Sequence, residues 1–429
     1  MAALTRVPFR VKGTVSVPGD KSISHRALIC ASLAHGASHV SGILDSADVR
    51  STAECLRAMG AAVPALAPAM TIEGAGPGSL HAPESGELAC GNSGTSARLL
   101  AGVVAGIGGT ATFTGDASLS RRPMRRVKAP LEAMGAAIEL PDHGGLPMTV
   151  RGAALHDIEW ESETSSAQVK SCVLLAALCA GVETTVREPV RSRDHTERML
   201  AAMGAEVWVN DTAVLLFAGQ RLTPLEITVP GDPSSASFLA ALAALAPHGE
   251  LLIQRVCVNE TRAGFFASLR EMGGVVSLVD QVRENGEWVA DVHVACGAPL
   301  KGVSVSGTAV PTLIDELPLL ACVGAYADGE TRVTGASELR VKESDRIAAV
   351  VSNLQALGAD AIELDDGFVV RGTRPALRGM VTTHGDHRLA MAFGVLAALP
   401  GNEIAIDDRD CVAVSYPTFW DDLARVTAA

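Results

Sequence analysis

Pro18-Gly19-Asp20-Lys21-Ser22-Ile23-Ser24-His25-Arg26 is the stretch from which the organisation of this chain follows. A strand-like run ends at the Pro-Gly turn, and an apolar helix follows directly. Lys21, Ser22 and Arg26 lie at the expected start of that helix, where free backbone N–H groups and the helix dipole favour an anion. Taken alone, the stretch fits a capped helix with solvated charges equally well, so the rest of the sequence must decide.

The composition indicates an α/β protein of more than one domain. At 429 residues the chain is too long for a single core. It is 48% hydrophobic and only 3% aromatic, with 42 glycines, which suits small, closely packed helices. The net charge of −13 argues against nucleic acid or an acidic membrane surface as a partner. An anionic ligand would therefore need a local cluster of Lys and Arg.

The spacing of the cysteines, the first ten residues and the lengths of the apolar runs together predict a soluble cytoplasmic protein. The nine cysteines are scattered and lack metal-type spacing, so reduced thiols are expected. Residues 1–10 contain neither the apolar core of a signal peptide nor a transit pattern. No apolar run approaches the roughly 18–20 residues that span a bilayer. We expect no membrane partner.

One structural unit recurs six times along the chain. A small-residue apolar helix ends near a glycine, and a β-branched run follows. These glycines, spaced 68 to 80 residues apart, are Gly36, Gly109, Gly181, Gly249, Gly329 and Gly401. We interpret them as left-handed caps at helix C-termini. A second, amphipathic helix ends most units, and the sixth copy is incomplete. Each unit reads as strand, buried helix, strand, amphipathic helix and strand pair.

A second copy of the opening turn divides the chain in two. Val229-Pro230-Gly231-Asp232 repeats Val17-Pro18-Gly19-Asp20 at an offset of 212 residues. We predict one domain over 20–229 and another that combines 1–19 with 230–429. Two chain crossings, near 18–21 and 229–233, would form a hinge, and a cleft between the domains suits small ligands.

Positive charges gather at the starts of the buried helices and in neighbouring loops. The segments are Lys21–Arg26, Gly91–Arg98, Ser165–Lys170, Arg121–Arg126, Arg191–His195, Arg340–Arg346 and His384–Arg388. Arg forks and helix N-termini together bind phosphates and carboxylates. Asp315-Glu316 begins the fifth helix, and carboxylates in a cationic cleft can be tuned for proton transfer.

Each of these segments also has a purely structural interpretation. Arg125 and Lys128 fit a solvated helix face better than a ligand site. The histidines at 25, 195 and 387 are expected to be hydrogen-bonded core residues, because none has a second metal ligand nearby. Cys90 fits a small buried residue better than a nucleophile. Asp315 and Glu343 could simply cap helices.

Motifs from end to end of the chain resemble the EPSP synthase family, the 3-phosphoshikimate 1-carboxyvinyltransferases. The matching segments are 18–26, Gly91-Asn92-Ser93-Gly94-Thr95, Gly115–Met124, Ser166-Ala167-Gln168, Asp315-Glu316, Leu339–Arg346 and Asp386-His387-Arg388. The resemblance implies a two-lobed inverse α/β barrel of six βαβαββ repeats, three in each lobe. It also implies a shikimate-pathway enzyme that leads toward chorismate and the aromatic amino acids.

The family resemblance implies transfer of the enolpyruvyl group of phosphoenolpyruvate to the 5-hydroxyl of shikimate 3-phosphate, with no metal or organic cofactor. The catalytic residues it implies are Lys21, Asp315 and Glu343. The implied ligands of shikimate 3-phosphate are Lys21, Ser22, Arg26, Ser166, Ala167, Gln168, Arg193, Asp315 and Lys342. Those of phosphoenolpyruvate are Lys21, Gly94, Arg122, Gln168, Arg346 and Arg388.

Two positions depart from the common family pattern. Ala167 stands where many members have a second serine, so one hydroxyl is lost from the sugar-phosphate pocket, and Arg193 is expected to replace it. Val414 stands where many members carry a lysine that binds phosphoenolpyruvate. We expect a monomer whose lobes close over both substrates.

Two alternatives remain at this point. A UDP-N-acetylglucosamine enolpyruvyl transferase shares fold and chemistry, but its Lys-Asn-Ala start and its reactive loop cysteine have no counterpart in Lys21-Ser22-Ile23 or in 116–126. A non-catalytic sensor could bind the same anions. Asp315 and Glu343 argue against the sensor, because binding alone does not call for acid and base groups.

Overall fold

The computed structural model describes residues 9–374 and 376–428, which pack into two compact units. Unit 1 contains the described part of 1–18, Gly231–Val282 and the described part of 288–429. Unit 2 contains Gly19–Pro230 and the short segment Arg283–Glu287. Residues 1–8 of the predicted domain that combines 1–19 with 230–429 lie outside the described residues, and hinge motion at the two crossings stays a prediction.

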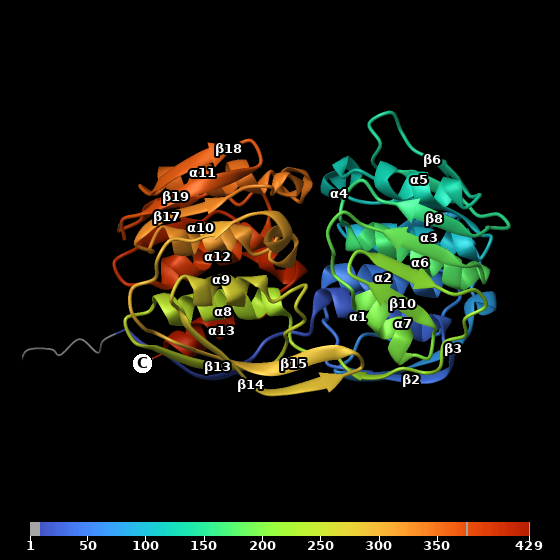
Figure 1. The fold of residues 1–429 in the computed structure, drawn as a ribbon, viewed down its shortest axis with the longest axis horizontal. Coiled ribbons are helices and arrows are strands. Elements are labelled where there is room, and N and C mark those ends of the chain that lie inside the picture. The colour runs from blue at the N-terminus through green and yellow to red at the C-terminus, as the bar shows by residue number, and fades with distance from the viewer. Residues whose placement is uncertain (1–8, 375, 429) are drawn as a thin grey trace, which may run out of the picture. The chain divides into compact units, whose positions relative to one another are not determined.

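Unit 2 has three small sheets (Figure 1). The first sheet has the spatial order β4 (Glu87–Ala89), β5 (Thr110–Thr114), β7 (Met148–Arg151) and β6 (Ala137–Glu139). The second has the order β10 (Val207–Asn210), β11 (Ala213–Leu216), β9 (Thr184–Arg187) and β8 (Ile158–Glu161). The third has the order β12 (Glu226–Thr228), β2 (His35–Ser41) and β3 (Ala69–Ala75). Its central helices are α1 (Lys21–Leu33), α3 (Gly94–Gly106) and α6 (Ala167–Ala180), and its other helices are α2 (Ala47–Ala58), η1 (Pro77–Ser79), α4 (Ala117–Arg121), α5 (Arg125–Ala133) and α7 (His195–Ala202).

Unit 1 is built in the same way. Its first sheet has the spatial order β1 (Val11–Ser16), β13 (Gly249–Cys257), β15 (Glu287–Ala295) and β14 (Val275–Glu284). Its second has the order β16 (Ser304–Val305), β17 (Gly329–Val333), β19 (Gly367–Gly372) and β18 (Asp360–Leu364). Its third pairs β20 (Arg378–Val381) with β21 (Glu403–Ile406). Its central helices are α8 (Pro233–Leu245), α10 (Leu317–Gly324) and α12 (His387–Ala398). The others are α9 (Gly264–Glu271), η2 (Gly307–Thr312), η3 (Ser337–Val341), α11 (Arg346–Ala356), η4 (Asp410–Val414) and α13 (Phe419–Thr427).

Each of the six described sheets contains one parallel strand pair, in agreement with the six predicted repeats. In four sheets a parallel pair flanks a central helix along the chain, as with β4 and β5 around α3. In the other two sheets β2 pairs with β12 and β13 pairs with β1, strands that lie far apart in the sequence. Antiparallel strands extend five of the sheets. The sheet of β20 and β21 has only the parallel pair, so the repeat that contains it is incomplete. A parallel pair of strands that are close in sequence needs a helical crossover, which is why a buried helix joins the two strands in those four sheets.

Small residues let the central helices pack at close range. In unit 2, α3 and α6 run side by side (Figure 1). A Cβ on Gly102 would lie 2.0 Å from the carbonyl oxygen of Cys172, and one on Gly106 would lie 2.4 Å from that of Ala176. Neither contact is possible for a side-chain carbon, so these two glycines set the spacing of the helix pair.

The prediction that six glycines cap the central helices is right at one position only. Gly181 ends α6 with φ 71° and ψ 24°, the left-handed cap that was expected. Gly249 lies inside β13, and α8 ends in an extended residue, Ala246. The regular left-handed glycines instead follow the second helices, at Gly60, Gly135, Gly204, Gly273 and Gly358. The prediction was wrong at positions such as Gly249 because a glycine that follows a helix in the sequence can be the first residue of the next strand.

Side-chain caps fix the N-terminal ends of five central helices. Asp20 accepts a hydrogen bond from the Ile23 N–H at 2.8 Å, and Asp386 accepts one from the Arg388 N–H at 2.9 Å. Ser93, Ser166 and Asp232 cap α3, α6 and α8 in the same manner. Such caps satisfy backbone donors that a helix start leaves unpaired. The predicted site residues therefore project from well-defined helix ends.

Candidate active site

The sequence-predicted residues form two groups, one in each unit. Unit 2 carries Lys21, Ser22, Arg26, Gly94, Arg122, Ser166, Ala167, Gln168 and Arg193, and unit 1 carries Asp315, Lys342, Glu343, Arg346 and Arg388. Most of them lie on the first turn of a helix or just before it. We call these sets the unit 2 group and the unit 1 group.

Lys21 opens helix α1 and is paired with an acid. Its Nζ lies 2.5 Å from Oδ2 of Asp48, a buried residue near the start of α2. The Lys21 side chain is 18% exposed, so the ammonium is still within reach of a ligand. No sequence motif marks Asp48, because its pairing with Lys21 depends on how α1 and α2 pack together.

Arg26 is held by hydroxyl groups one turn further along α1. Its Nε donates to Oγ1 of Thr196 at 2.7 Å, and its Nη2 donates to Oγ of Ser171 at 2.8 Å. Its Nη1 donates to the carbonyl oxygen of Ser22 at 3.0 Å. The residue is only 3% exposed, and burial lowers the pKa of Arg26 from its ordinary value. An arginine nevertheless remains a cation at neutral pH.

Gln168 has a fixed amide orientation because Arg98 and Thr95 hold both of its ends. Arg98 Nη1 donates to Oε1 of Gln168 at 2.5 Å, and the Gln168 Nε2 donates to Oγ1 of Thr95 at 3.0 Å. Arg98 is 7% exposed and also donates to the carbonyl oxygen of Pro123. Sequence analysis included Arg98 in a motif but gave it no role, since its contact with Gln168 spans 70 residues.

Arg122 and Gly94 lie side by side. Arg122 is 9% exposed, and its Nη2 donates to Oδ1 of Asn92 at 2.6 Å. A Cβ on Gly94 would lie 2.9 Å from Nη1 of Arg98 and 3.5 Å from Nη1 of Arg122. Glycine at this position therefore makes room for two guanidinium groups.

Arg346 is the centre of the unit 1 group. It is 1% exposed, and its Nε donates to Oδ2 of Asp386 at 2.8 Å. Its Nη1 donates to Asp315 Oδ1 at 3.2 Å and its Nη2 donates to Glu343 Oε2 at 2.7 Å. Burial alone would lower the pKa of Arg346, but the charges of Asp386, Glu343 and Asp315 outweigh it and raise that pKa. One guanidinium thus arranges three carboxylates.

Asp315 is surrounded by cations. Besides Arg346, its carboxylate has Lys342 Nζ at 3.6 Å, Arg388 Nη2 at 3.7 Å and Arg262 Nη1 at 3.9 Å. Asp315 is 8% exposed. The cations thus surround a carboxylate, a group that can accept a proton. Arg262 was missed by sequence analysis, because it lies in none of the recognised motifs.

The structural interpretations of His25 and Cys90 are confirmed, whereas Lys128 is only partly solvated, because its Nζ also donates to the carbonyl oxygen of Ile138. His25 is buried, and its Nδ1 lies 2.7 Å from Oγ1 of Thr52. Cys90 is buried, and a hydrogen bond with Cys55 together with burial raises the pKa of its thiol, which disfavours the nucleophilic thiolate. Lys128 pairs with Glu132 at 2.6 Å on the partly exposed face of α5.

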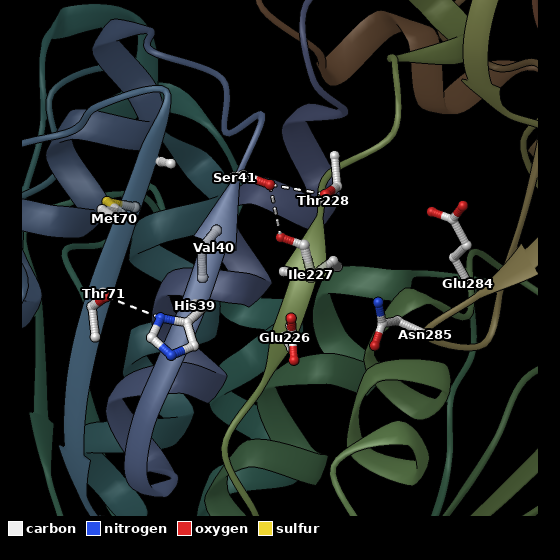
Figure 2. Close-up of a pocket in the computed structure, with 11 residues that line it drawn as sticks. His39, Val40, Ser41, Met70, Thr71, Glu226, Ile227, Thr228, Glu284 and Asn285 are labelled. Carbon is white, nitrogen blue, oxygen red and sulfur yellow. Dashed lines mark hydrogen bonds between the residues drawn. The ribbon is translucent and has the colours of Figure 1, made fainter.

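One shallow hollow of unit 2 lies apart from the unit 2 group. It is formed along β2 and β12 and beside the segment Arg283–Glu287 (Figure 2). Its lining residues are His39, Val40, Ser41, Ala69, Met70, Thr71, Glu226, Ile227, Thr228, Glu284 and Asn285. None of these is a predicted site residue, so we place no substrate there.

Within 9–374 and 376–428, no three His, Cys, Asp or Glu side chains are grouped so that they could hold a metal ion. In the same part of the chain, every helix is too short or too polar to cross a membrane.

The two groups differ in chemistry. The unit 2 group combines cations, hydroxyls and an oriented amide, a set that binds anionic and hydroxylated ligands. The unit 1 group adds carboxylates to its cations, so it can bind anions and also transfer protons.

Comparison with known proteins identifies the relatives of this chain. The family model for EPSP synthase (3-phosphoshikimate 1-carboxyvinyltransferase) matches residues 6–423. A 3-phosphoshikimate 1-carboxyvinyltransferase of Persephonella marina is 45% identical over 97% of both chains, and one of Aquifex aeolicus is 46% identical over 97% of both. A solved EPSP synthase of Acinetobacter baumannii has a TM-score of 0.85 and 39% identity, and the match covers 98% of this chain and 96% of that one.

A more distant structure shares the fold alone. The enolpyruvyl transferase NikO of Streptomyces tendae has a TM-score of 0.76 at 19% identity, and the match covers 97% of this chain and 95% of that one. The predicted fold class, an α/β fold of the enolpyruvyl transferase type, is confirmed by these two likenesses.

Proposed function

The chain belongs to the EPSP synthase family, and we propose that the unit 1 and unit 2 groups bind and convert the substrates of that family. It is an enolpyruvyl transferase that moves the enolpyruvyl group of phosphoenolpyruvate to the 5-hydroxyl of shikimate 3-phosphate and releases phosphate. What remains to be assigned is the role of each residue.

We assign shikimate 3-phosphate mainly to the unit 2 group. Its ligands there are Lys21, Ser22, Arg26, Ser166, Ala167, Gln168 and Arg193, with Asp315 and Lys342 from unit 1. The fixed guanidinium of Arg26 and the held amide of Gln168 support this assignment, since pre-oriented donors lose little entropy on binding. Arg193 takes the place of the hydroxyl that Ala167 lacks.

Phosphoenolpyruvate is assigned to Lys21, Gly94, Arg122, Gln168, Arg346 and Arg388. The support is the close approach of two guanidinium groups, those of Arg98 and Arg122, to Gly94. A phosphate and a carboxylate on one small molecule call for several bidentate donors. Arg346 already contacts three carboxylates, so its binding to phosphoenolpyruvate would add a fourth anion.

The acid–base roles go to Asp315 and Glu343. In the addition step the 5-hydroxyl oxygen bonds to C2 of phosphoenolpyruvate, Asp315 accepts the hydroxyl proton, and C3 receives a proton from Glu343. In the elimination step Glu343 takes a proton back from C3, the C2=C3 double bond re-forms, the C2–O bond to phosphate breaks, and the proton held by Asp315 leaves with the phosphate. Lys21 stabilises negative charge on the reacting groups.

The single observation that carries this assignment is the shared guanidinium. Arg346 donates to both Asp315 and Glu343, so the two groups proposed for proton transfer are held side by side. A sensor that only bound anions would have no need of two carboxylates among its cations.

Phosphate release tests the proposal. The protein is mixed with shikimate 3-phosphate and phosphoenolpyruvate, and inorganic phosphate is followed with time. We expect release that requires both substrates and stops when UDP-N-acetylglucosamine replaces shikimate 3-phosphate. Binding of both ligands without release would favour the sensor instead. A monomeric state and a cytoplasmic location remain predictions, which sedimentation and cell fractionation would check.

A further inference from the structure

A buried ion cluster lies beneath the start of helix α6. Lys170 Nζ is 2.9 Å from Oε2 of Glu188 and 2.8 Å from Oε1 of Glu197, and all three side chains are only 2% exposed. Burial alone would lower the pKa of Lys170, but the charges of Glu197 and Glu188 raise it above its ordinary value. A fully buried charge is retained only when it is paired and hydrogen-bonded. None of these three residues has a role in the proposed site.

Glu188 has contacts that Glu197 lacks. Its Oε1 accepts the backbone N–H of Ser166 at 2.8 Å. The Ser192 hydroxyl is 2.8 Å from both carboxylate oxygens of Glu188, and the Ser192 N–H donates to Oε2 at 3.3 Å. Glu188 therefore joins two segments, the residues that begin α6 and the loop that leads from β9 to α7.

A second tie reinforces the same junction. The Ser165 hydroxyl donates to the carbonyl oxygen of Val190 at 2.5 Å, and the Val190 N–H donates to the Ser165 Oγ at 3.0 Å. Ser166 follows Ser165, and Arg193 follows Ser192. Ser166 and Arg193 are both proposed ligands of shikimate 3-phosphate. The two sets of hydrogen bonds thus fix the backbone near Ser166 relative to the backbone near Arg193.

We infer that Glu188 is a positioning residue for shikimate 3-phosphate, which sets Ser166 and Arg193 at the separation that the ligand requires. The inference rests on the proposed function, because it takes Ser166 and Arg193 as ligands. It also explains how this chain can lack a hydroxyl at Ala167. Arg193 has a long, flexible side chain, so it can take over the role of that hydroxyl only if the loop from β9 to α7 is held in place. Lys170 supplies the counter-charge that keeps the Glu188 carboxylate buried.

The competing interpretation is that the cluster only stabilises unit 2. Glu197→Gln is the matched control, because it removes one of the two carboxylates of Lys170 but none of the contacts to Ser166 or Ser192. Both Glu188→Gln and Glu197→Gln should lower the melting temperature, since each leaves the buried ammonium with one carboxylate.

The experiment is calorimetric titration of shikimate 3-phosphate into wild type, Glu188→Gln and Glu197→Gln, together with steady-state kinetics. For Glu188→Gln we expect the Kd and KM of shikimate 3-phosphate to rise about tenfold, as for loss of a hydrogen bond to a charged group. The KM for phosphoenolpyruvate and kcat at saturation should stay near wild type. For Glu197→Gln the Kd of shikimate 3-phosphate should rise clearly less than for Glu188→Gln, because Glu197 acts on Arg26 only through its charge and contacts neither Ser166 nor Ser192.

Three results would overturn the inference: no rise in the Kd for Glu188→Gln, an equal rise for Glu197→Gln, or an equal loss of phosphoenolpyruvate affinity. If Glu188→Gln does not fold, Ser192→Ala tests the same tie, with Ser32→Ala as its control, because the buried Ser32 hydroxyl bonds only to the Leu28 carbonyl among the described residues. Ser192→Ala should raise the Kd about threefold, and no rise overturns the inference. Wild type that releases no phosphate would instead overturn the proposed function.

Discussion

Asp315 and Glu343 share one guanidinium: Arg346 donates to Asp315 from Nη1 at 3.2 Å and to Glu343 from Nη2 at 2.7 Å. Arg346 in turn is fixed by Asp386, which also caps helix α12. The two acids are thus held by a side chain that is itself anchored to a helix end. Such pre-organisation keeps the proton-transfer groups in place before substrate arrives.

Asp315→Asn should lower kcat far more than it weakens binding. The asparagine keeps the shape of the side chain but cannot accept the hydroxyl proton, so we expect a loss of about 10²–10⁴-fold in kcat. The Kd of shikimate 3-phosphate should change much less. Phosphate release and calorimetry measure the two quantities, with Asp328→Asn as a control at an exposed acid of the same unit. A kcat within a few-fold of wild type would remove Asp315 from the role of base.

Arg122→Ala should weaken phosphoenolpyruvate binding selectively. Its guanidinium lies beside Gly94 and is oriented by Asn92, in the part of the unit 2 group assigned to phosphoenolpyruvate. We expect the KM for phosphoenolpyruvate to rise by about 10-fold or more, the usual cost of losing a charged hydrogen-bonding partner. The KM for shikimate 3-phosphate should stay nearly constant.

Arg125→Ala is the control for Arg122→Ala, because Arg125 is exposed on the same segment and was interpreted as a solvated charge. It should leave both KM values unchanged. Equal losses of the two affinities in Arg122→Ala would contradict the assignment of this arginine to phosphoenolpyruvate.

Gly94→Ala should act through Arg98. The new Cβ would lie 2.9 Å from Arg98 Nη1, so the buried guanidinium must shift, and with it the hydrogen bond to Gln168. We expect a higher KM for phosphoenolpyruvate with little change in melting temperature. The control is Gly109→Ala, where a Cβ would meet nothing closer than 3.4 Å. An unchanged KM in Gly94→Ala would show that Arg98 can move without cost.

The repeats and the helix starts could be predicted from sequence because their causes are local. A buried helix needs an apolar run, and a helix start needs a cap. Both are visible over one short segment, as from Asp20 to Leu33. The misplaced glycine caps have a local cause too. A positive φ is available to glycine in a strand or turn as well as at a helix end, so Gly36 and Gly329 resembled caps while lying in strands.

The supporting residues of the site could not be predicted, because their roles arise from tertiary packing. Arg98 reaches Gln168 across 70 positions, and Arg346 reaches Asp386 across 40. Glu188 resembles any acid that follows a strand until its contact with Ser166 is known. Motif matching finds residues that touch a substrate, whereas the residues that hold them leave no comparable local pattern.

His25 makes the stability of the protein depend on pH. Burial, with the nearby charges of Lys21 and Arg26, lowers the pKa of His25 well below its ordinary value. The unfolded chain therefore takes up a proton below about pH 6.5 that the folded state refuses. Stability from this group is fully present above that pH and falls as the pH drops, by up to about 1.4 kcal/mol per pH unit.

His25→Gln should remove this contribution while keeping a polar partner for Thr52. We expect the melting temperature of wild type to fall more steeply between pH 7.5 and pH 5.5 than that of the variant, because only wild type carries the buried imidazole. Differential scanning calorimetry across that range measures both slopes, and His156→Gln, at an exposed histidine, should retain the wild-type slope. Parallel slopes for wild type and His25→Gln would mean that the folded state accommodates a proton on His25. Other groups would then set the acid sensitivity of the protein.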